Sequence, residues 1–300
     1  MMDLAAHRTE LLRHCYRMLG SFADAEDVVQ DVLVSAWKAR ASFSGDVPVV
    51  HWLMRIATNT CLNELAKRKR RSLPALEREP GTTIDEIEQV EAATWITPAP
   101  ERVLETRESV ALAFIALLQR LPPRQRATLL LKDVVGWSAE EIAATLDLSV
   151  SATNSALHRA REAIGTPRNA SADPPPALLR EFIRSWEEHD VEGLVALLRD
   201  DVALAMPPHA TWFRGPQVVE FLRSARFARF WTQGLKVSVT RANGQLALMF
   251  FVRAPEGLRR HSLQLVELVD GRVAQMLQFI GDYYLHGFEQ FPAGDLSIET

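Results

Sequence analysis

Residues 137–164 carry the signals of two short helices joined by a tight turn. In Ser138-Ala-Glu-Glu141 the serine hydroxyl can accept a bond from a free backbone amide while the glutamate reaches back, which makes a capping box. The helix that starts there ends near Asp147, and Ser149 is placed to cap the next one. Because a polar second helix after a tight turn suits the major groove of DNA, we predict a helix-turn-helix.

The second helix of this pair has an apolar side and a polar side. Its apolar side recurs at spacings of three and four residues, at Thr153, Leu157, Ala160 and Ile164. The other side faces outward and supplies the candidate groove-facing residues, which are Ser151, Ala152, Asn154, Ser155, His158 and Arg159. Their types leave open which bases they would contact.

The first 71 residues predict a three-helix domain, residues 1–71. One helix is expected over residues 4–19, with Gly20 as its left-handed cap, and a second over about 24–38. In the second helix the pattern predicts a buried stripe of Val29, Val32, Leu33, Ala36 and Trp37. It leaves Asp27, Gln30 and Asp31 exposed together, and an acidic stripe is by itself most often a solvated surface.

The third helix, expected from about residue 49 to residue 71, is the most informative of the three. Asn59, Asn63, Lys67 and Arg70 fall on one face at spacings of four, four and three, and residues 67–71 are five consecutive cations. This face suits phosphates, and carboxamides can recognise base edges. A solvated helix end whose cations complement the helix dipole is the alternative. The candidate DNA-binding residues here are Asn59, Asn63, Lys67, Arg68, Arg70 and Arg71.

Charge is distributed unevenly along the chain. Residues 1–71 hold 11 basic and 8 acidic side chains, whereas residues 72–105 hold 2 and 8. The acidic segment also loses periodicity and gains prolines, so we predict an extended linker over residues 72–105. A second helical domain is expected over residues 106–166, followed by a Pro-rich linker, residues 167–176.

The pattern changes class after the second linker. Amphipathic helices come first, and four strands follow with turns such as Asn243-Gly244 and Asp270-Gly271. Residues 177–292 therefore predict an α+β cone, with residues 293–300 as a tail. The expected fold class is multidomain, with two all-α domains followed by this α+β domain.

Composition limits the function classes. With 47% apolar residues the chain can form two or three cores, and no stretch is long and apolar enough to span a bilayer, so we expect no membrane contact. The N-terminal residues show no export signal, and Cys15 and Cys61 lack metal-ligand spacing. We expect a soluble chain in the reducing cytoplasm, with no disulfide, no metal site and no cofactor.

Several spaced motifs occur in an order that resembles a known family: Ala25-Glu-Asp-Val-Val-Gln-Asp31 with Trp37, Phe43-Ser-Gly45, Trp52-Leu-Met-Arg-Ile-Ala57 and Leu157-His-Arg-Ala-Arg161. Over residues 1 to about 165 the chain resembles the bacterial extracytoplasmic-function sigma factors. The resemblance implies that core RNA polymerase, through the clamp of its largest subunit and its flap, and promoter DNA are the partners. It assigns Asp27, Gln30 and Asp31 to the clamp, and the acidic linker to the template and RNA-exit channels.

The resemblance also implies the DNA contacts. A loop at residues 42–48, with Ser42, Phe43 and Ser44, would join Asn59 and Asn63 to capture a flipped base of the minus-ten element, while residues 67–71 hold the backbone. The helix-turn-helix would recognise the minus-thirty-five element. Similar factors carry Lys or Arg where this chain has Asn154 and Ala156, so we expect a smaller ionic contribution there.

Motifs past residue 177 resemble the SnoaL-like branch of the nuclear-transport-factor-like (NTF2-like) fold: Phe182-Ile-Arg-Ser-Trp186, Asp190-Val-Glu-Gly-Leu194 and Trp212-Phe-Arg-Gly215. This fold hosts enzymes, binders and dimerisation modules alike. We expect a regulatory, non-catalytic domain acting by intramolecular contact or through a small-molecule ligand. Trp186, Met206, Trp212 and Phe279 are the candidate ligand-pocket residues. An enzyme would use His209, His261, Asp282 or Tyr283 instead.

Three hypotheses follow. The first is a sigma factor that catalyses no covalent step and has no catalytic residues, with the C-terminal domain modulating its activity. The second is a SnoaL-type isomerase or cyclase fused to a DNA-binding module, and the third is a ligand-responsive one-component regulator. The acidic exposed stripe favours the first, because neither alternative requires a polymerase-docking surface.

Overall fold

The computed structural model describes residues 3–85, 87–101, 111–165, 173–232 and 234–288. Several predicted segments lie outside these residues: the end of the acidic linker at 102–105, the ends of the second helical domain at 106–110 and 166, residues 167–172 of the Pro-rich linker, the end of the cone at 289–292 and the tail at 293–300. The chain divides into two compact units. The first takes in the described residues up to Ser72 together with residues 112–165, and the second takes in the described residues of 73–101 and 173–288 together with Ala111.

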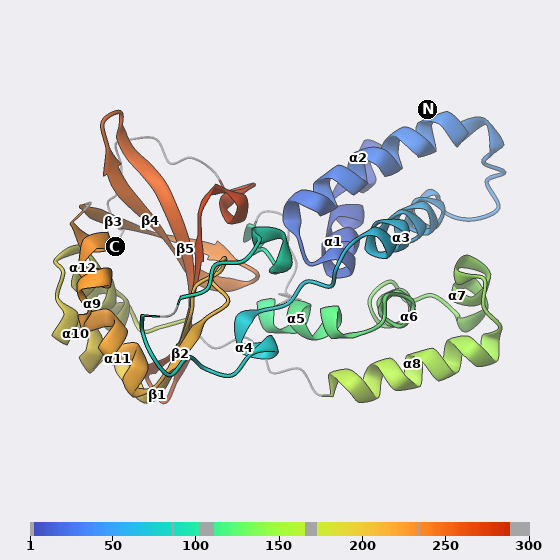
Figure 1. Cartoon of the computed structure of the whole chain (residues 1–300). Helices are drawn as coiled ribbons and strands as arrows, with labels where there is room; N and C mark the ends of the chain where they lie inside the picture. Colours follow the sequence, from blue (N-terminus) through green and yellow to red (C-terminus); the bar gives the residue numbers. More distant parts are fainter. Residues whose placement is uncertain (1–2, 86, 102–110, 166–172, 233, 289–300) are drawn as a thin grey trace. The chain divides into compact units, whose positions relative to one another are not determined.

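Among the described residues of the first unit, every named element is a helix (Figure 1). Helices α1, α2 and α3 pack pairwise, α5 and α6 pack against α1, and α8 packs against α6 and α7. The helices are α1 (Arg8–Leu19), α2 (Phe22–Ala39), α3 (Val49–Lys67), α5 (Leu112–Arg120), α6 (Pro123–Asp133), α7 (Ala139–Leu146) and α8 (Val150–Ile164), with short 3₁₀ helices at Ala5–His7 and Arg40–Ser42.

The caps expected from the sequence are confirmed. Gly20 ends α1 with φ 68°, in the left-handed region where the absence of a Cβ removes the steric cost. Ser138 and Glu141 form the reciprocal capping box at the start of α7. Ser149 caps α8 by accepting a bond from the amide of Ala152 at 3.1 Å. Local sequence therefore fixes where the helix-turn-helix begins and turns.

Two features of α2 differ from the prediction. The helix begins at Phe22, because the Ser21 side chain caps it, and Trp37 is 54% exposed instead of buried. The buried stripe continues from Val32 to Ala36. Trp37, one residue further on, is rotated by about 100° away from that stripe and toward solvent.

Helix α3 is shorter than expected. It ends at Lys67, so Arg70 does not share a helix face with Asn59 and Asn63. Continuing the helix would stack like charges three and four residues apart. The chain instead turns Arg71 inward, where it is 5% exposed and its Nη2 lies 2.8 Å from Asp24 Oδ2.

One buried cation joins the helices of the first unit. Arg126 of α6 is 2% exposed, and its guanidinium donates to the carbonyl of Met18 at the end of α1 and to the Gln119 side chain. It also donates to the carbonyls of Gln119 and Leu121 at 3.0 and 3.1 Å. Burial lowers the pKa of Arg126 to about 10, which leaves it charged at neutral pH. The charge therefore satisfies acceptors that would otherwise be buried without a donor.

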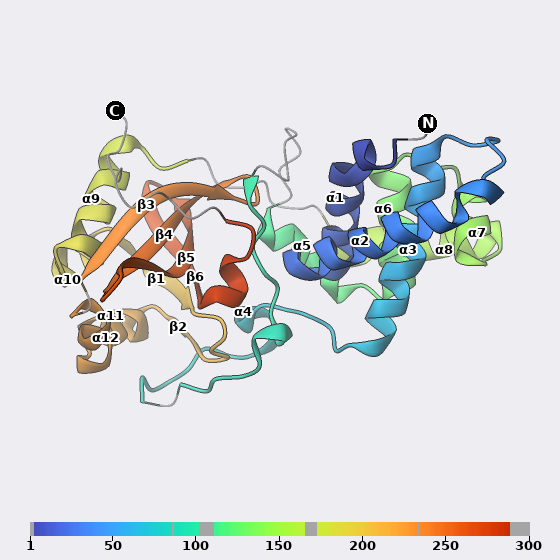
Figure 2. The same cartoon turned by 90° about the horizontal axis from the view of Figure 1, so that it is seen from above.

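In the second unit the described residues form one six-stranded sheet of order β2-β1-β6-β5-β4-β3 (Figure 2). Strands β3 to β6 make the expected antiparallel meander, while β1 pairs in parallel with β6 and antiparallel with β2. The strands are β1 (Leu198–Ala205), β2 (Trp212–Arg214), β3 (Leu235–Ala242), β4 (Gln245–Ala254), β5 (Gly257–Val269) and β6 (Arg272–Ile280). The three-residue β2 is not predicted from the sequence.

Four helices of this unit are α9 (Pro176–Glu187), α10 (Val191–Ala196), α11 (Pro216–Arg223) and α12 (Ala225–Trp231). Ser224 separates the last two, because its side chain caps α12. Trp186 of α9 and Trp231 of α12 share the core with Phe250 of β4. The expected fold class, all-α followed by α+β, is confirmed.

Residues 73–101, which we call the linker segment, pack on the second unit. The Gly81 amide donates to the Trp212 carbonyl at 2.7 Å, and the Ala210 amide donates to the Glu88 carbonyl at 2.8 Å. Ala99 and Asn243 exchange bonds of 2.9 and 3.0 Å. The segment contains α4 (Pro74–Glu77) and a 3₁₀ helix at Ala92–Thr94. It is thus anchored along its length to the C-terminal domain.

Candidate functional sites

The outer face of α2 carries the residues expected to contact polymerase. Asp27, Gln30 and Asp31 are all exposed, at the spacing that places them on one face of the helix. Two large apolar side chains lie beyond them, since Val34 is 52% and Trp37 54% exposed. Among the described residues Asp27 and Asp31 form no ion pair. The sequence pattern did not predict that Val34 and Trp37 are exposed. The spacing of four and then three residues from Asp27 through Asp31 to Val34 could have indicated that Val34 lies on the same exposed face.

The loop before α3 is shaped by an aromatic pair. Phe43 is half-buried, and its ring centroid lies 4.9 Å from that of Trp52. Ser42 donates to the Ala39 carbonyl at 2.7 Å, and Ser44 accepts from the Asp46 amide at 3.4 Å. Trp52 is itself half-buried against the loop. The predicted loop residues thus adjoin α3 through a tilted aromatic pair.

Farther along α3 the polar face is exposed. Asn59, Asn63 and Lys67 are all accessible, and Arg68 and Arg70 lie just past the helix end. Arg68 pairs with Asp24 and with Glu64, the latter at 3.3 Å. The prediction that Arg71 contacts DNA is wrong, because its pairing with Asp24 places it inside the unit.

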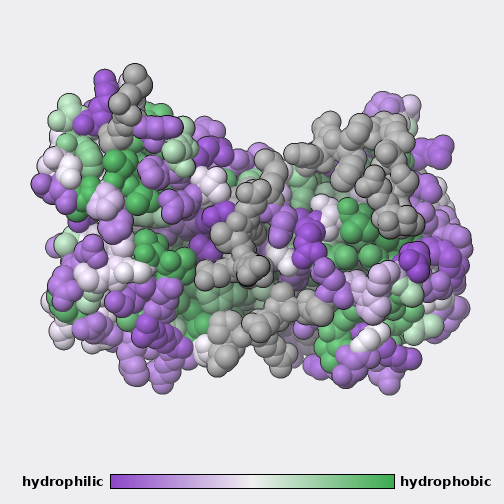
Figure 3. All heavy atoms as spheres, turned by 180° about the vertical axis from the view of Figure 1, so that it is seen from behind, coloured by the Kyte–Doolittle hydropathy of each residue, from purple (hydrophilic) through white to green (hydrophobic). Residues whose placement is uncertain are grey.

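Helix α8 presents the polar side that the periodicity predicts. Ser151, Asn154, Ser155, His158 and Arg159 are exposed and line a shallow hollow on the surface with Val150, while Ala152 is half-buried. Thr153, Leu157 and Ala160 are buried against the unit. Arg161 donates from Nε to Asp133 of α6 at 3.1 Å, which fixes the orientation of the helix. Figure 3 shows hydrophobic side chains in view on both units, set among hydrophilic ones.

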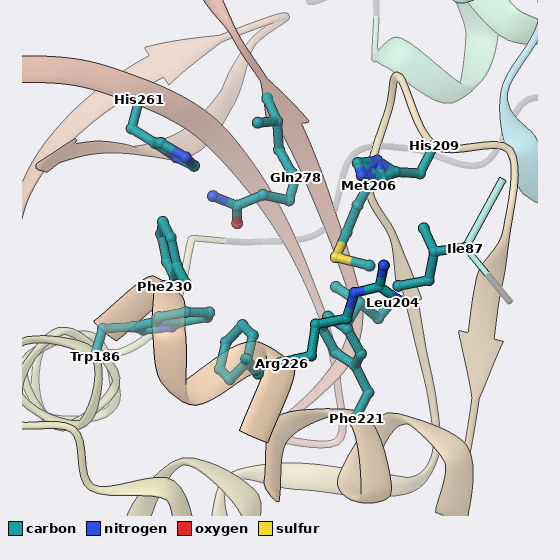
Figure 4. A pocket seen from close by; sticks show the side chains of 12 residues that line it. Ile87, Trp186, Leu204, Met206, His209, Phe221, Arg226, Phe230, His261 and Gln278 are labelled. Carbon is teal, nitrogen blue, oxygen red and sulfur yellow. The ribbon is translucent and has the colours of Figure 1, made fainter. Parts of the chain in front are cut away.

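The second unit contains a cavity of about 200 Å³ between the sheet, α12 and the linker segment (Figure 4). Trp186 and Met206 line it as expected. Trp212 and Phe279 do not: the Trp212 indole donates to the Arg78 carbonyl at 2.8 Å, and the fully buried Phe279 packs on Tyr284. A buried aromatic residue near a cone is therefore not sufficient to predict a pocket.

Two of the candidate enzyme residues, His209 and His261, line this cavity together, whereas Asp282 and Tyr283 are not among its lining residues. Burial lowers the pKa of His209, and Arg226 adds to the effect. Burial also lowers the pKa of His261 to about 4, with a smaller contribution from Arg259. Both imidazoles are therefore neutral at pH 7. Their convergence depends on how strand β5 faces the end of β1, which the sequence does not reveal.

Within the described residues no three His, Cys, Asp or Glu side chains lie together as metal ligands would. Of the helices in those same ranges, none has both the length and the apolar composition that crossing a membrane requires.

Comparison with known proteins decides the family. The Sigma-70 region 2 family matches residues 4–71, and the Sigma-70 region 4 family matches residues 111–164. The chain is 38% identical to the ECF RNA polymerase sigma factor SigG of Mycobacterium tuberculosis, over 93% of this chain and 81% of that protein. This chain belongs to the extracytoplasmic-function sigma factors.

Two further relatives show how far the likeness extends. The ECF RNA polymerase sigma-E factor of Escherichia coli is 35% identical over 145 residues, which cover 47% of this sigma factor and 72% of the relative. The crystal structure of the extracytoplasmic function sigma factor SigJ of Mycobacterium tuberculosis superposes with a TM-score of 0.59 at 21% identity, over 93% of this chain and 96% of that one. SigJ therefore shares the fold along nearly the whole length, including the C-terminal unit.

Proposed function

We propose that this sigma factor binds core RNA polymerase through the exposed face of α2 and directs it to promoters. Region 2, residues 4–71, would recognise the minus-ten element, and region 4, residues 111–164, the minus-thirty-five element. The observation that carries this proposal is the α2 face. It combines carboxylates at Asp27 and Asp31 with the exposed apolar side chains of Val34 and Trp37. A mixed charged and apolar surface of this kind is typical of protein interfaces.

An exchange of charge on this face tests the docking surface. Asp31→Lys should lower the affinity for core polymerase at least ten-fold, because a cation replaces an anion at the centre of the proposed contact. Glu10→Lys, the same charge change on an exposed position of α1, is the matched control and should bind as the native protein does. Analytical ultracentrifugation of the holoenzyme measures both. Equal affinity of the two variants would place the docking surface elsewhere.

We further propose that the C-terminal domain modulates the sigma factor without catalysing a reaction, and that the protein acts in the cytoplasm with polymerase. The linker segment supports the first part, because hydrogen bonds hold this connection between regions 2 and 4 on the C-terminal domain. The enzyme alternative finds support only in His209 and His261. The cavity that they share has no Asp or Glu among its described lining residues, which an acid–base reaction of the SnoaL type requires.

A further inference from the structure

The cavity of the second unit has mostly apolar walls. Phe221 and Phe230 face it from α11 and α12, and Leu204 faces it from β1 (Figure 4). Ile280 of β6 also lines it. Its volume is about 200 Å³. An apolar cavity of roughly 150 Å³ accommodates benzene, so this space suits a single substituted ring. Size and lining therefore favour a compact, ring-containing molecule.

Two polar atoms in this wall lack partners. The indole Nε1 of Trp186 and Nδ1 of His209 are buried, and neither has a hydrogen-bond partner among the described residues. Trp186 is 3% exposed, and an indole nitrogen can only donate. Because an unpaired buried donor is costly, such an atom indicates a missing acceptor. Of the other polar wall residues on the sheet, Gln278 already bonds Ser262 and Gln264, and Nδ1 of His261 lies 3.0 Å from Ser262 Oγ.

Among the described lining residues, Arg226 alone has a side chain that is charged at neutral pH. This residue is exposed, and its Nη1 donates to the carbonyls of Ile84 and Asp85, both at 3.4 Å. The two imidazoles are neutral, for the reason given above. The described lining residues thus offer no buried cation to a carboxylate, and they favour an uncharged oxygen such as a carbonyl.

The linker segment contributes a wall of its own. Ile87 lines the cavity, whereas Ile84, three residues earlier, packs against the core beside it without lining the cavity. The backbone next to Ile87 is attached to the cone, because the Glu88 amide donates to Thr211 Oγ1 at 3.0 Å. A molecule in the cavity would therefore contact the segment that connects regions 2 and 4.

We propose that this cavity binds a small uncharged molecule with one ring and a carbonyl or hydroxyl oxygen, held by the Trp186 indole and covered by Ile87 of the linker segment. Occupancy would strengthen the attachment of the linker segment to the C-terminal domain, because the molecule buries Ile87 further. The proposal goes beyond promoter recognition, and the binding assay below contains neither polymerase nor DNA. A failure of either proposal therefore leaves the other standing.

Three molecules of one shape test the ligand chemistry on the full-length protein. Acetophenone carries the carbonyl acceptor, α-methylstyrene replaces that oxygen by a methylene group, and benzoate adds a charge. Isothermal titration should show acetophenone binding at least ten-fold more tightly than either of the others. In Trp186→Phe the difference between acetophenone and α-methylstyrene should shrink several-fold, because the donor is gone. Equal binding of these two by the native protein, tightest binding of benzoate, or no saturable binding of any of the three overturns the proposal.

A matched pair of variants tests the cover. Ile87→Ala should weaken acetophenone binding three-fold or more, while Ile84→Ala removes the same side chain from the same segment outside the cavity and should leave it unchanged. Acetophenone should also slow hydrogen exchange at the Glu88 amide, which reports attachment of the linker segment. Equal effects of the two variants, or exchange that the ligand does not change, would remove Ile87 from the site.

Discussion

His14 shows how one buried side chain makes stability depend on pH. It is 3% exposed, and its Nε2 lies 2.9 Å from Thr58 Oγ1. Thr58 donates its own hydrogen to the Met54 carbonyl at 2.8 Å, so it accepts from the imidazole, which is neutral and protonated on Nε2. Burial lowers the pKa of His14 to about 4, and Arg17 adds to the effect.

The direction of the pH effect follows from this pKa. Between pH 6.5 and about 4 the unfolded chain binds more protons at His14 than the folded one, so the free energy of unfolding falls as the pH falls. The full loss from this residue is about 3 kcal/mol. His14→Gln should flatten the profile over this window in urea denaturation series at several pH values. A variant profile parallel to the native one would contradict the assignment.

Asn59 and Asn63 are the candidate minus-ten base contacts on α3. Both are exposed, one helical turn apart on α3. A lost base contact costs about 1–3 kcal/mol, so Asn59→Ala and Asn63→Ala should each reduce discrimination between minus-ten sequences about ten-fold. Lys67→Ala, on the same side, should weaken all sequences equally and lower the salt dependence. Run-off transcription on a set of minus-ten variants measures this, and unchanged selectivity in both alanine variants would exclude base recognition by this face.

At the scale of elements, the Asn243-Gly244 turn has two roles. Asn243 lies in the left-handed region with φ 53°, as the turn between β3 and β4 requires, and its side chain also accepts the buried amide of Ala99. Asn243→Gly keeps the turn and removes the acceptor, which should cost about 1–3 kcal/mol. Asn243→Asp keeps an oxygen in place and is the control. Hydrogen exchange at the Ala99 amide should rise markedly in the glycine variant and little in the aspartate variant. Equal exchange in the two variants would show that the Asn243 side chain does not hold the linker segment.

Helix ends could be predicted where the capping residues lie close to their partners in the sequence. Gly20, the Ser138–Glu141 box and Ser149 act on neighbouring amides and carbonyls, so the sequence itself contains both partners. The positions of Arg71 and the linker segment could not be predicted, because their partners lie far along the chain. The outward side of α8 followed from periodicity. The cavity was only half foreseen, since the meeting of His209 and His261 depends on strand register.

At the scale of the whole molecule, regions 2 and 4 contact each other within the first unit. His51 Nδ1 of α3 lies 3.6 Å from Glu141 of α7, and Arg55 donates to Thr145 at 3.3 Å. A unit of this length has a radius of gyration of about 14 Å. The minus-ten and minus-thirty-five promoter elements, about 25 base pairs apart, are separated by roughly 85 Å at 3.4 Å per base pair. On the proposed assignment of region 2 to one element and region 4 to the other, the two regions must separate on a promoter.

Labels on the two regions can follow this separation. Cysteines introduced at the exposed positions Ala66 of α3 and Glu162 of α8 can be labelled selectively, because Cys15 and Cys61 are buried. The distance between the labels, from electron–electron double resonance, should lengthen by more than about 30 Å when polymerase and promoter are added, given the spacing above. An unchanged distance would mean that the two regions bind DNA without parting.

The attachment of the linker segment also determines how a protein without the C-terminal domain would behave. Trp95, Ile96 and Ala99 are at most 2% exposed, and the Trp95 indole donates to the Pro208 carbonyl at 3.1 Å. Truncation before residue 177 would remove the C-terminal domain, expose these apolar side chains and leave amides of the linker segment without acceptors. The truncated protein should therefore self-associate. A single substitution such as Asn243→Gly weakens the attachment of the linker segment while the surface on which it packs stays intact.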